Sequence, residues 1–410
     1  MICPEPSELQ ELVRDLHRQA TPWLPAGSGS RLAWGAAVQA GPGQSEPLVL
    51  STARLNRILS FSPEDFTVTV QAGTPLVALQ QELAHHRQWL ALDWPWGSRP
   101  DGRASGSVGG LVARGLAGGY RQRYLGIRDQ LIGIRILRAD GVAARAGGKV
   151  VKNVAGYDLM RLFTASWGSL GLITELTLRT MPLPPVRAAL LLRGPATALI
   201  ERVALLLRSG LSPERLDLWS PALAAAAGLE EAPHLLIALG SVSLASLEAQ
   251  IAVGRSAAGP LACTTLEAEA LASLLSRTRP EAGASRSAAD PAAWLLRLAV
   301  TPSRAAELID YPDLAGIAIN QAAASGLATA WAAANALTIA QVLELRRLCI
   351  ELGGHLTVLR QPASGINAWE DAPSRPLIEA VKARFDPLGQ LAPGRLPGVA
   401  RPQRAGAPAR

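Results

Sequence analysis

The sequence predicts an α+β protein of two domains, and three observations support this. The chain has 410 residues, which is enough for two large domains. Residues 181–185 (MPLPP) place three prolines within four positions, which ends regular structure and marks a domain boundary. Beyond this boundary strands and helices alternate: 188–192, 197–208, 216–219, 235–240 and 244–258. Because a similar order recurs between 293 and 353, we expect a mostly antiparallel sheet covered by helices, of ferredoxin-like type.

The elements before the boundary follow from periodicity. Residues 7–20 predict an amphipathic helix, because Leu9, Leu12 and Leu16 fall on one face. Residues 66–72 alternate Val with polar residues and predict a strand, followed by a helix that Thr74 caps and that runs to about residue 87. Further strands are expected at 21–25, 47–52, 131–137, 141–146, 150–154 and 172–180. Residues 91–126 lack periodicity, and so long an irregular stretch indicates a functional segment.

Composition excludes several classes of protein. With 49% hydrophobic and 18% charged residues the chain is neither disordered nor fibrous. The net charge of +7 permits an anionic partner, or equally a solvated arginine-rich surface. No basic run with interleaved aromatic residues appears, which argues against nucleic acid. The three cysteines lack metal-ligand spacing, so we expect no metal site and a reduced, cytoplasmic setting.

Neither end of the chain nor its interior predicts a membrane segment. The first twenty residues carry acidic side chains and no apolar core, so no signal peptide is expected. Residues 314–343 carry no charge, but they are mostly alanine with several amides. We therefore expect a buried strand followed by a helix there, and no transmembrane span.

Two glycine- and serine-rich segments are the candidate binding loops. Gly27-Ser28-Gly29 is neither a Rossmann fingerprint nor a P-loop, and it is open to two interpretations: an ordinary turn, or backbone N–H groups that approach an anion beside Arg31. The segment 105–110 (SGSVGG) repeats this chemistry, flanked by Arg99, Arg103 and Arg114. Two such loops with arginines fit a dinucleotide, and a flexible loop with solvated arginines is the alternative.

Five short motifs follow one another along the chain: Pro25-x-Gly-x-Gly29, Val70-x-Ala-Gly73, Ser107-Val-Gly-Gly110, Gly126-x-x-Asp129 and Asp140-Gly141. In this order they resemble the FAD-binding domain of the vanillyl-alcohol oxidase/PCMH family. More narrowly, residues 147–158 (GGKVVKNVAGYD) with Gly168-x-x-Gly171 closely resemble the smaller FAD-binding subunit of bacterial glycolate oxidase. The C-terminal Arg384-Phe-Asp-Pro-Leu-Gly389 and Pro393-Gly-Arg395 are similar to the end of that subunit.

The resemblance implies a two-lobed PCMH-type FAD-binding domain at 1–185 and an α+β cap at 186–398. It implies that residues 375–398 pack back on the first domain and that 399–410 form a disordered tail. Gly27 to Arg31 would hold the pyrophosphate, residues 105–110 and Gly115 the ribityl chain and ring, while Ile173 presents backbone atoms or simply packs in the core. The candidate FAD-binding residues are Pro25, Ala26, Gly27, Ser28, Gly29, Ser30, Arg31, Ser105, Gly106, Ser107, Gly109, Gly110, Gly115 and Ile173. Because no His or Cys lies between Arg87 and Pro233, we expect non-covalent FAD.

The function implied is that of an FAD-binding subunit of a glycolate dehydrogenase, which oxidises glycolate or another small 2-hydroxy acid. Its partners would be a larger FAD-binding subunit and an iron–sulfur subunit, through which it would attach to the inner face of the membrane. The chain lacks the His-x-Gly-Asp-Gly-Asn-x-His segment of the larger subunit. His355 as a base and Arg360 as a carboxylate clamp are the nearest candidates, or ordinary strand residues. The alternatives are a stand-alone FAD-dependent alcohol or sugar oxidase and a non-enzymatic flavoprotein subunit.

Overall fold

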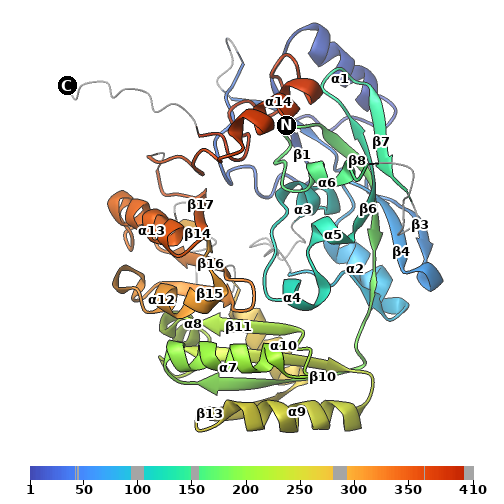
Figure 1. Cartoon of the computed structure of the whole chain (residues 1–410). Coiled ribbons are helices and arrows are strands. Elements are labelled where there is room, and N and C mark those ends of the chain that lie inside the picture. Colours follow the sequence, from blue (N-terminus) through green and yellow to red (C-terminus); the bar gives the residue numbers. More distant parts are fainter. Residues whose placement is uncertain are drawn as a thin grey trace.

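The computed structural model describes residues 1–41, 43, 46–93, 106–148, 157–279, 293–363 and 365–400. These residues form two lobes (Figure 1). The N-terminal lobe contains a five-stranded sheet and a small parallel sheet, and the C-terminal lobe contains one eight-stranded antiparallel sheet. The predicted α+β class is therefore confirmed.

The five-stranded sheet has the order β3-β4-β8-β6-β7, and every neighbouring pair is antiparallel. The strands are β3 Ile58–Ser62, β4 Thr67–Gln71, β6 Leu131–Leu137, β7 Ala143–Gly147 and β8 Leu172–Arg179. In the centre of the sheet Val70 lies opposite Leu176, and neither side chain is exposed. The helices that supply apolar residues to the same core are α2 Leu76–His85, α3 Val108–Arg114, α5 Ile127–Gln130 and α6 Met160–Phe163.

The parallel sheet joins the two ends of the chain. It consists of β1 Trp23–Ala26 and β2 Leu48–Ser51, beside the amphipathic helix α1 Leu9–Arg18. Leu391 lies beside Trp23 like an added strand, because Trp23 N donates to Gln390 O at 2.8 Å and Ala392 N donates to Trp23 O at 2.8 Å. Before this segment comes α14 Arg375–Phe385, which Figure 1 shows beside the N-terminal lobe. Lys382 Nζ on this helix donates to Ser169 O at 2.7 Å.

The C-terminal lobe is a tandem of two ferredoxin-like units in one sheet. Its strand order is β13-β10-β12-β11-β15-β16-β14-β17, and β11 pairs with β15 where the units meet. The first unit contains β10 Val186–Arg193, α7 Ala196–Arg208, β11 Arg215–Trp219, α8 Pro221–Ala226, β12 His234–Ser241, α9 Leu244–Ala258, β13 Ala262–Glu267 and α10 Ala268–Arg277. The second contains β14 Trp294–Ala299, α12 Ala305–Ile309, β15 Ala318–Ala322, β16 Leu327–Ala332, α13 Ile339–Glu351 and β17 His355–Arg360. The predicted ferredoxin-like order is thus present twice.

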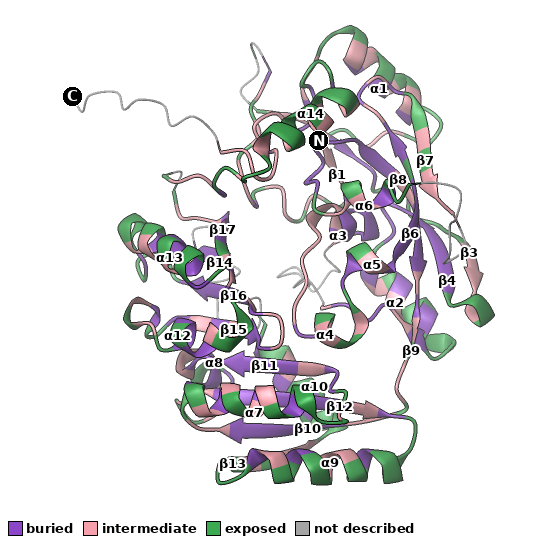
Figure 2. Ribbon diagram, viewed as in Figure 1, coloured by how far each residue is buried: buried purple, intermediate pink, exposed green. Residues whose placement is uncertain are grey.

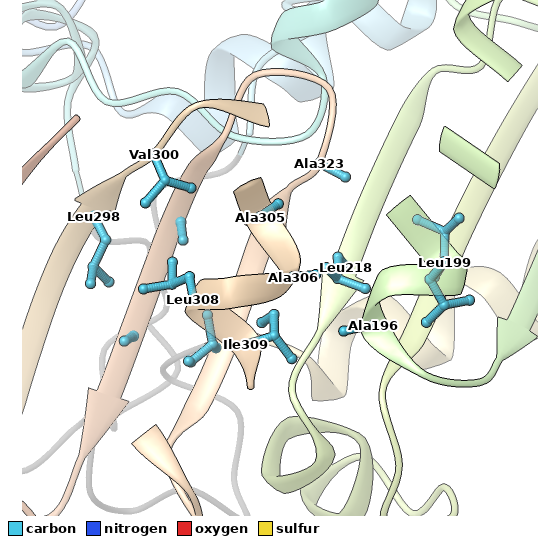
Figure 3. Packing of buried hydrophobic residues seen from close by; sticks show 14 of the residues in the cluster. Ala196, Leu199, Leu218, Leu298, Val300, Ala305, Ala306, Leu308, Ile309 and Ala323 are labelled. Carbon is cyan, nitrogen blue, oxygen red and sulfur yellow. The ribbon is translucent and has the colours of Figure 1, made fainter. Parts of the chain in front are cut away.

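The two faces of the eight-stranded sheet have different partners. One face packs against α7, α9, α12 and α13, and Figure 3 shows side chains such as Leu199, Leu218 and Leu308 meeting there. The strands are largely buried, whereas the outer sides of these helices are exposed (Figure 2). The other face carries Trp219, Trp331 and Leu359, which pack with α8, α10 and Trp34 and Trp167 of the N-terminal lobe. Alternation along each strand therefore gives one face to the core and one to the lobe interface.

Several contacts join the two lobes. The strand pair β5 Gln88–Trp89 and β9 Met181–Pro182 lies at the boundary, and α4 Arg121–Tyr124 contacts β11. Gly35 N donates to Leu359 O at 2.7 Å, which ties the loop after β1 to β17. In the part of the chain that is described, no helix has both the length and the apolar character that a membrane crossing needs.

Several local expectations are corrected. The stretch 91–126 is not wholly irregular, because 108–114 forms α3. Its sequence VGGLVAR has two glycines and little helical propensity, but Ser107 caps it and Gly110 N donates to Ser107 Oγ at 3.2 Å. The helix α2 begins at Leu76 after Pro75, so Thr74 is not its N-cap. The expected strand at 150–154 lies outside the described residues, as does nearly all of the expected tail.

Candidate functional site

The first cavity lies where the loop after β1, the loop before α3 and the start of β8 meet. Of the predicted FAD-binding residues, those that line it are Pro25, Ala26, Gly27, Ser28, Gly29, Ser30, Arg31, Gly106, Ser107, Gly109, Gly110 and Ile173. Segments some eighty residues apart in sequence therefore share one cavity. Ser105 falls outside the described residues.

The two glycine- and serine-rich loops touch each other. A Cβ on Gly27 would lie 2.0 Å from Ser107 Oγ, so a side chain at this position would force one of the two loops to shift. Gly106 N donates to Ser28 Oγ at 3.3 Å across the same contact. Ser51 Oγ of β2 donates to Gly27 O at 2.7 Å and holds the first loop against the parallel sheet. The result is a cradle of backbone atoms without bulky side chains, which suits close approach by a phosphate.

The charged side chains that line the first cavity are all cationic among the described residues. Arg31, Arg114 and Arg395 line it, whereas no Asp or Glu is found among its described lining residues. Burial, together with the charges of Arg395 and Arg31, holds the pKa of Arg114 well below its ordinary value. A cationic cavity with a glycine cradle fits a dinucleotide cofactor such as FAD.

Two other predicted residues have different positions. Gly115 does not line the first cavity; it ends α3 with φ +62°, and a Cβ there would lie 2.8 Å from Ala165. Its place is explained by the turn rather than by a ligand. Ile173 lines the cavity and is 7% exposed within the core of the N-terminal lobe, so it packs in the core, and its contact with the cofactor stays a prediction.

A second cavity of about 220 Å³ lies between the lobes. Leu116 lines both cavities, so the two are adjacent. The N-terminal lobe contributes Asp93 and residues 116–120, and the eight-stranded sheet contributes the opposite wall. This is the place at which a ligand beyond the cofactor would contact both lobes.

A row of side chains crosses the sheet at this wall. The strand register places Thr357, Arg297, Thr329, Asn320 and Trp219 side by side on β17, β14, β16, β15 and β11. Arg297 Nη1 donates to Thr329 Oγ1 at 2.9 Å, and Nη2 donates to Ala117 O of the other lobe. Burial lowers the pKa of Arg297 to about 10, and no described carboxylate forms an ion pair with it.

A carboxylate cluster fixes the neighbouring wall. Arg215 Nη2 lies 2.5 Å from Asp217 Oδ2 and 3.4 Å from Asp93 Oδ1. Asp217 is fully buried and its Oδ1 has no hydrogen-bond partner within the described structure, so burial raises its pKa to about 6. A Cβ on Gly119 would lie 2.1 Å from Asp217 Oδ1. The absence of a side chain at Gly119 therefore allows the backbone of the N-terminal lobe to approach Asp217 closely. Arg215 also lies over the ring of Tyr120, 4.7 Å from its centre.

The predicted catalytic pair lies outside the two cavities described above. His355 is exposed at the start of β17, and Arg360 Nε donates to Ala293 O at 3.0 Å. Neither residue lines the first or the second cavity. Burial and the charge of Arg297 lower the pKa of His355. The catalytic roles of His355 and Arg360 therefore stay a prediction, which these two cavities do not support.

The sequence interpretation missed Arg297, Asp93, Arg215 and Asp217. The available signal was the presence of charged residues in apolar strands, one in residues 294–299 (WLLRLA) and two in residues 215–219 (RLDLW). A buried charge is costly and is kept where it has a partner or a ligand. Among the described residues no group of His, Cys, Asp and Glu has the arrangement of a metal site.

The sequence of the N-terminal lobe is similar to that of a known family. Residues 1–147 match the profile described as "FAD binding domain". The N-terminal lobe is therefore similar to FAD-binding domains over these residues. FAD, the expected cofactor, is confirmed with it, whereas non-covalent attachment stays a prediction.

Curated relatives of this FAD-binding chain support the expected likeness to glycolate oxidase subunits. The chain is 36% identical over 192 residues to "Glycolate oxidase subunit GlcE" of Escherichia coli (strain K12), which covers 47% of this chain and 51% of the relative. It is 33% identical over 214 residues to "D-2-hydroxyglutarate dehydrogenase" of Xanthomonas citri pv. viticola, covering 52% and 43%. The matches thus span about half of this chain and about half or less of each relative.

Solved structures show the fold of the whole FAD-binding chain. A 4-ethylphenol oxidase from Gulosibacter chungangensis superposes with a TM-score of 0.70 at 16% identity, covering 96% of this chain and 88% of that one. An alkyldihydroxyacetonephosphate synthase gives 0.66 at 16% identity, covering 96% and 77%. The predicted PCMH-type fold with an α+β cap is therefore confirmed.

Proposed function

We propose that this chain is the FAD-binding subunit of a glycolate dehydrogenase that oxidises glycolate, or a similar small 2-hydroxy acid, to the 2-oxo acid. The observation that carries the proposal is the first cavity, where two glycine- and serine-rich loops meet beside three arginines and no described carboxylate. Likeness to named glycolate oxidase subunits supports the reaction class. A larger FAD-binding subunit and an iron–sulfur subunit are the proposed partners, in a cytoplasmic complex at the inner face of the membrane.

The second cavity is the proposed substrate site. Bound FAD supplies the two-electron oxidant for the alcohol carbon. The chain itself contributes Arg297, whose guanidinium is held by Thr329 and Ala117 and faces a cavity of small-molecule size. The indole N–H of Trp331 on the same wall has no described acceptor. A buried cation without a described ion-pair partner gains most from an anionic ligand, which supports a carboxylate here.

A relay or structural flavin is a second candidate function. Asp93 is the only carboxylate among the described residues that line the second cavity, and no described His lines it. Asp93 already forms an ion pair with Arg215 and accepts a hydrogen bond from Tyr120 N at 3.2 Å. Under this alternative the larger subunit removes the substrate proton, and this chain holds a flavin that passes electrons on or only stabilises the complex.

The test compares the chain purified alone with the chain co-expressed with candidate partner subunits. We expect protein that releases stoichiometric FAD on denaturation, which also checks non-covalent attachment. Glycolate-dependent reduction of a dye by the chain alone would assign it the catalytic site, and reduction only in the complex would favour the relay role. Turnover of an alcohol or sugar with oxygen and without partners would favour a stand-alone oxidase. Folded protein that neither contains nor binds FAD would overturn the proposal.

A further inference from the structure

Three arginines from separate segments converge on the first cavity. Arg31 follows β1, Arg114 is the last residue of α3, and Arg395 lies in the segment after α14. A Cβ on Gly106 would lie 2.9 Å from Arg31 Nη1, so this guanidinium lies over the second loop. Arg114 Nη2 donates to Arg31 O at 2.5 Å.

The cluster costs energy as long as nothing anionic enters it. Arg114 Nη1 is covered by protein and has no hydrogen-bond partner among the described residues. Its guanidinium stacks on the ring of Trp167, 4.3 Å from the ring centre, which gives it no acceptor. Like charges that are removed from water disfavour one another, and the described lining of the cavity offers no carboxylate to offset them.

We infer that Arg114 and Arg395, together with Arg31, bind the diphosphate of FAD, and that the C-terminal segment 386–395 is therefore part of the cofactor site. A diphosphate carries two negative charges and oxygens that match the fork of a guanidinium. This inference rests on the FAD part of the proposed function and is independent of the substrate.

Arg395 also has a structural role, which the test must separate from ligand binding. The side chain is 3% exposed, and it donates from Nε to Ala36 O at 2.6 Å and from Nη2 to Leu32 O at 2.7 Å. A purely structural Arg395 would support the loop after β1 whatever the ligand. A phosphate-binding Arg395 discriminates between flavins that carry a diphosphate and flavins that do not.

The experiment uses full-length protein freed of FAD, the variants R114M and R395M, and R384M as the control. Arg384 is an exposed arginine on α14, close in sequence to Arg395. Binding of FAD, riboflavin and ADP is titrated by quenching of flavin fluorescence or by competition, at low and high salt. Methionine keeps apolar packing against Trp167 while it removes the charge. The melting temperature of each FAD-free protein is recorded in parallel.

We expect R114M and R395M each to weaken FAD and ADP binding by roughly ten- to hundredfold, which is the range for a charge-assisted hydrogen bond. Riboflavin affinity should stay within about twofold, the salt dependence of FAD binding should become shallower, and R384M should match the wild type. FAD affinity within about threefold of wild type in both variants would overturn the inference. So would equal losses for FAD and riboflavin together with a lower melting temperature of the FAD-free protein. A wild-type chain that binds no FAD would instead overturn the proposed function itself.

Discussion

Arg297 and Thr329 lie opposite each other on β14 and β16, and the guanidinium donates to the hydroxyl at 2.9 Å. The second Nη of Arg297 reaches Ala117 O in the FAD-binding domain. A single side chain therefore spans the lobe interface at the wall of the second cavity. Because both anchors are fixed by the sheet and by backbone, the position of the charge is set before any ligand binds.

Replacement of Arg297 by methionine should weaken the binding of small carboxylates without loss of FAD. We expect affinity for glycolate or oxalate to fall by roughly ten- to hundredfold, because a charge-assisted hydrogen bond is lost. Titration of the flavin absorption spectrum with oxalate measures this directly. R208M, at an exposed position on α7, is the matched control. Unchanged oxalate affinity in R297M would remove Arg297 from the proposed substrate site.

Replacement of Gly27 by alanine should weaken FAD binding, since the new Cβ would lie 2.0 Å from Ser107 Oγ and must push the two loops apart. Overpacking of this kind costs about 1–3 kcal/mol, or roughly five- to hundredfold in affinity if it falls on the bound state. Gly210 has open space around its Cβ position, so G210A should bind FAD like the wild type. The double variant G27A/S107G should recover part of the loss; no recovery would place the clash elsewhere.

Asp217 should make stability depend on pH in an unusual direction. Its pKa is raised to about 6 by burial, whereas it is near 3.8 in the unfolded chain. The folded state therefore holds the proton more tightly, so this contribution is complete below about pH 4 and is lost as the pH rises through about 6. Between these values the wild type should lose about 2–3 kcal/mol relative to D217N. Urea unfolding of both proteins at several pH values measures the difference, and parallel curves would show that Asp217 does not titrate in this range.

The helix-covered core of the cap should be sensitive to cavities. Leu308 on α12 is unexposed in the cluster of Figure 3, and L308A should lower the free energy of unfolding by about 2–5 kcal/mol. Leu207 on α7 is 51% exposed, so L207A should change it by less than about 0.5 kcal/mol. Chemical denaturation followed by circular dichroism compares the two. Similar losses in both variants would contradict the packing described here.

Elements with strong local signals were predictable from sequence. The strand at 131–137 and the helix at 244–258 coincide with β6 and α9, because apolar runs and a serine N-cap define their ends. The edge strand β3 was missed, since Ile58 and Leu59 are exposed and give no buried alternation. The helix α3 was missed because its stability comes from burial of Val108 and Val112, not from propensity.

Some residues of the candidate site could be identified from the sequence, and others could not. Gly27 and Ser107 were identifiable because loops of small residues bind phosphates through their backbone, which needs no knowledge of distant contacts. Arg297 was not identified, because its importance depends on strand register across β14, β16 and β15 and on the other lobe. His355 was chosen for its chemistry alone, and the fold places it outside both cavities.

The pairing of Trp23 with Leu391 joins a strand near the start of the sequence to a segment synthesised much later. Gln390 Nε2 donates to Leu16 O at 2.9 Å and Thr21 O at 3.0 Å, so the segment that follows α14 completes the N-terminal lobe. Synthesis must therefore reach residue 392 before that lobe can close. Until then the edge of β1 at Trp23 has no partner strand. Chains truncated before Leu391 should therefore be targets for chaperones and proteases.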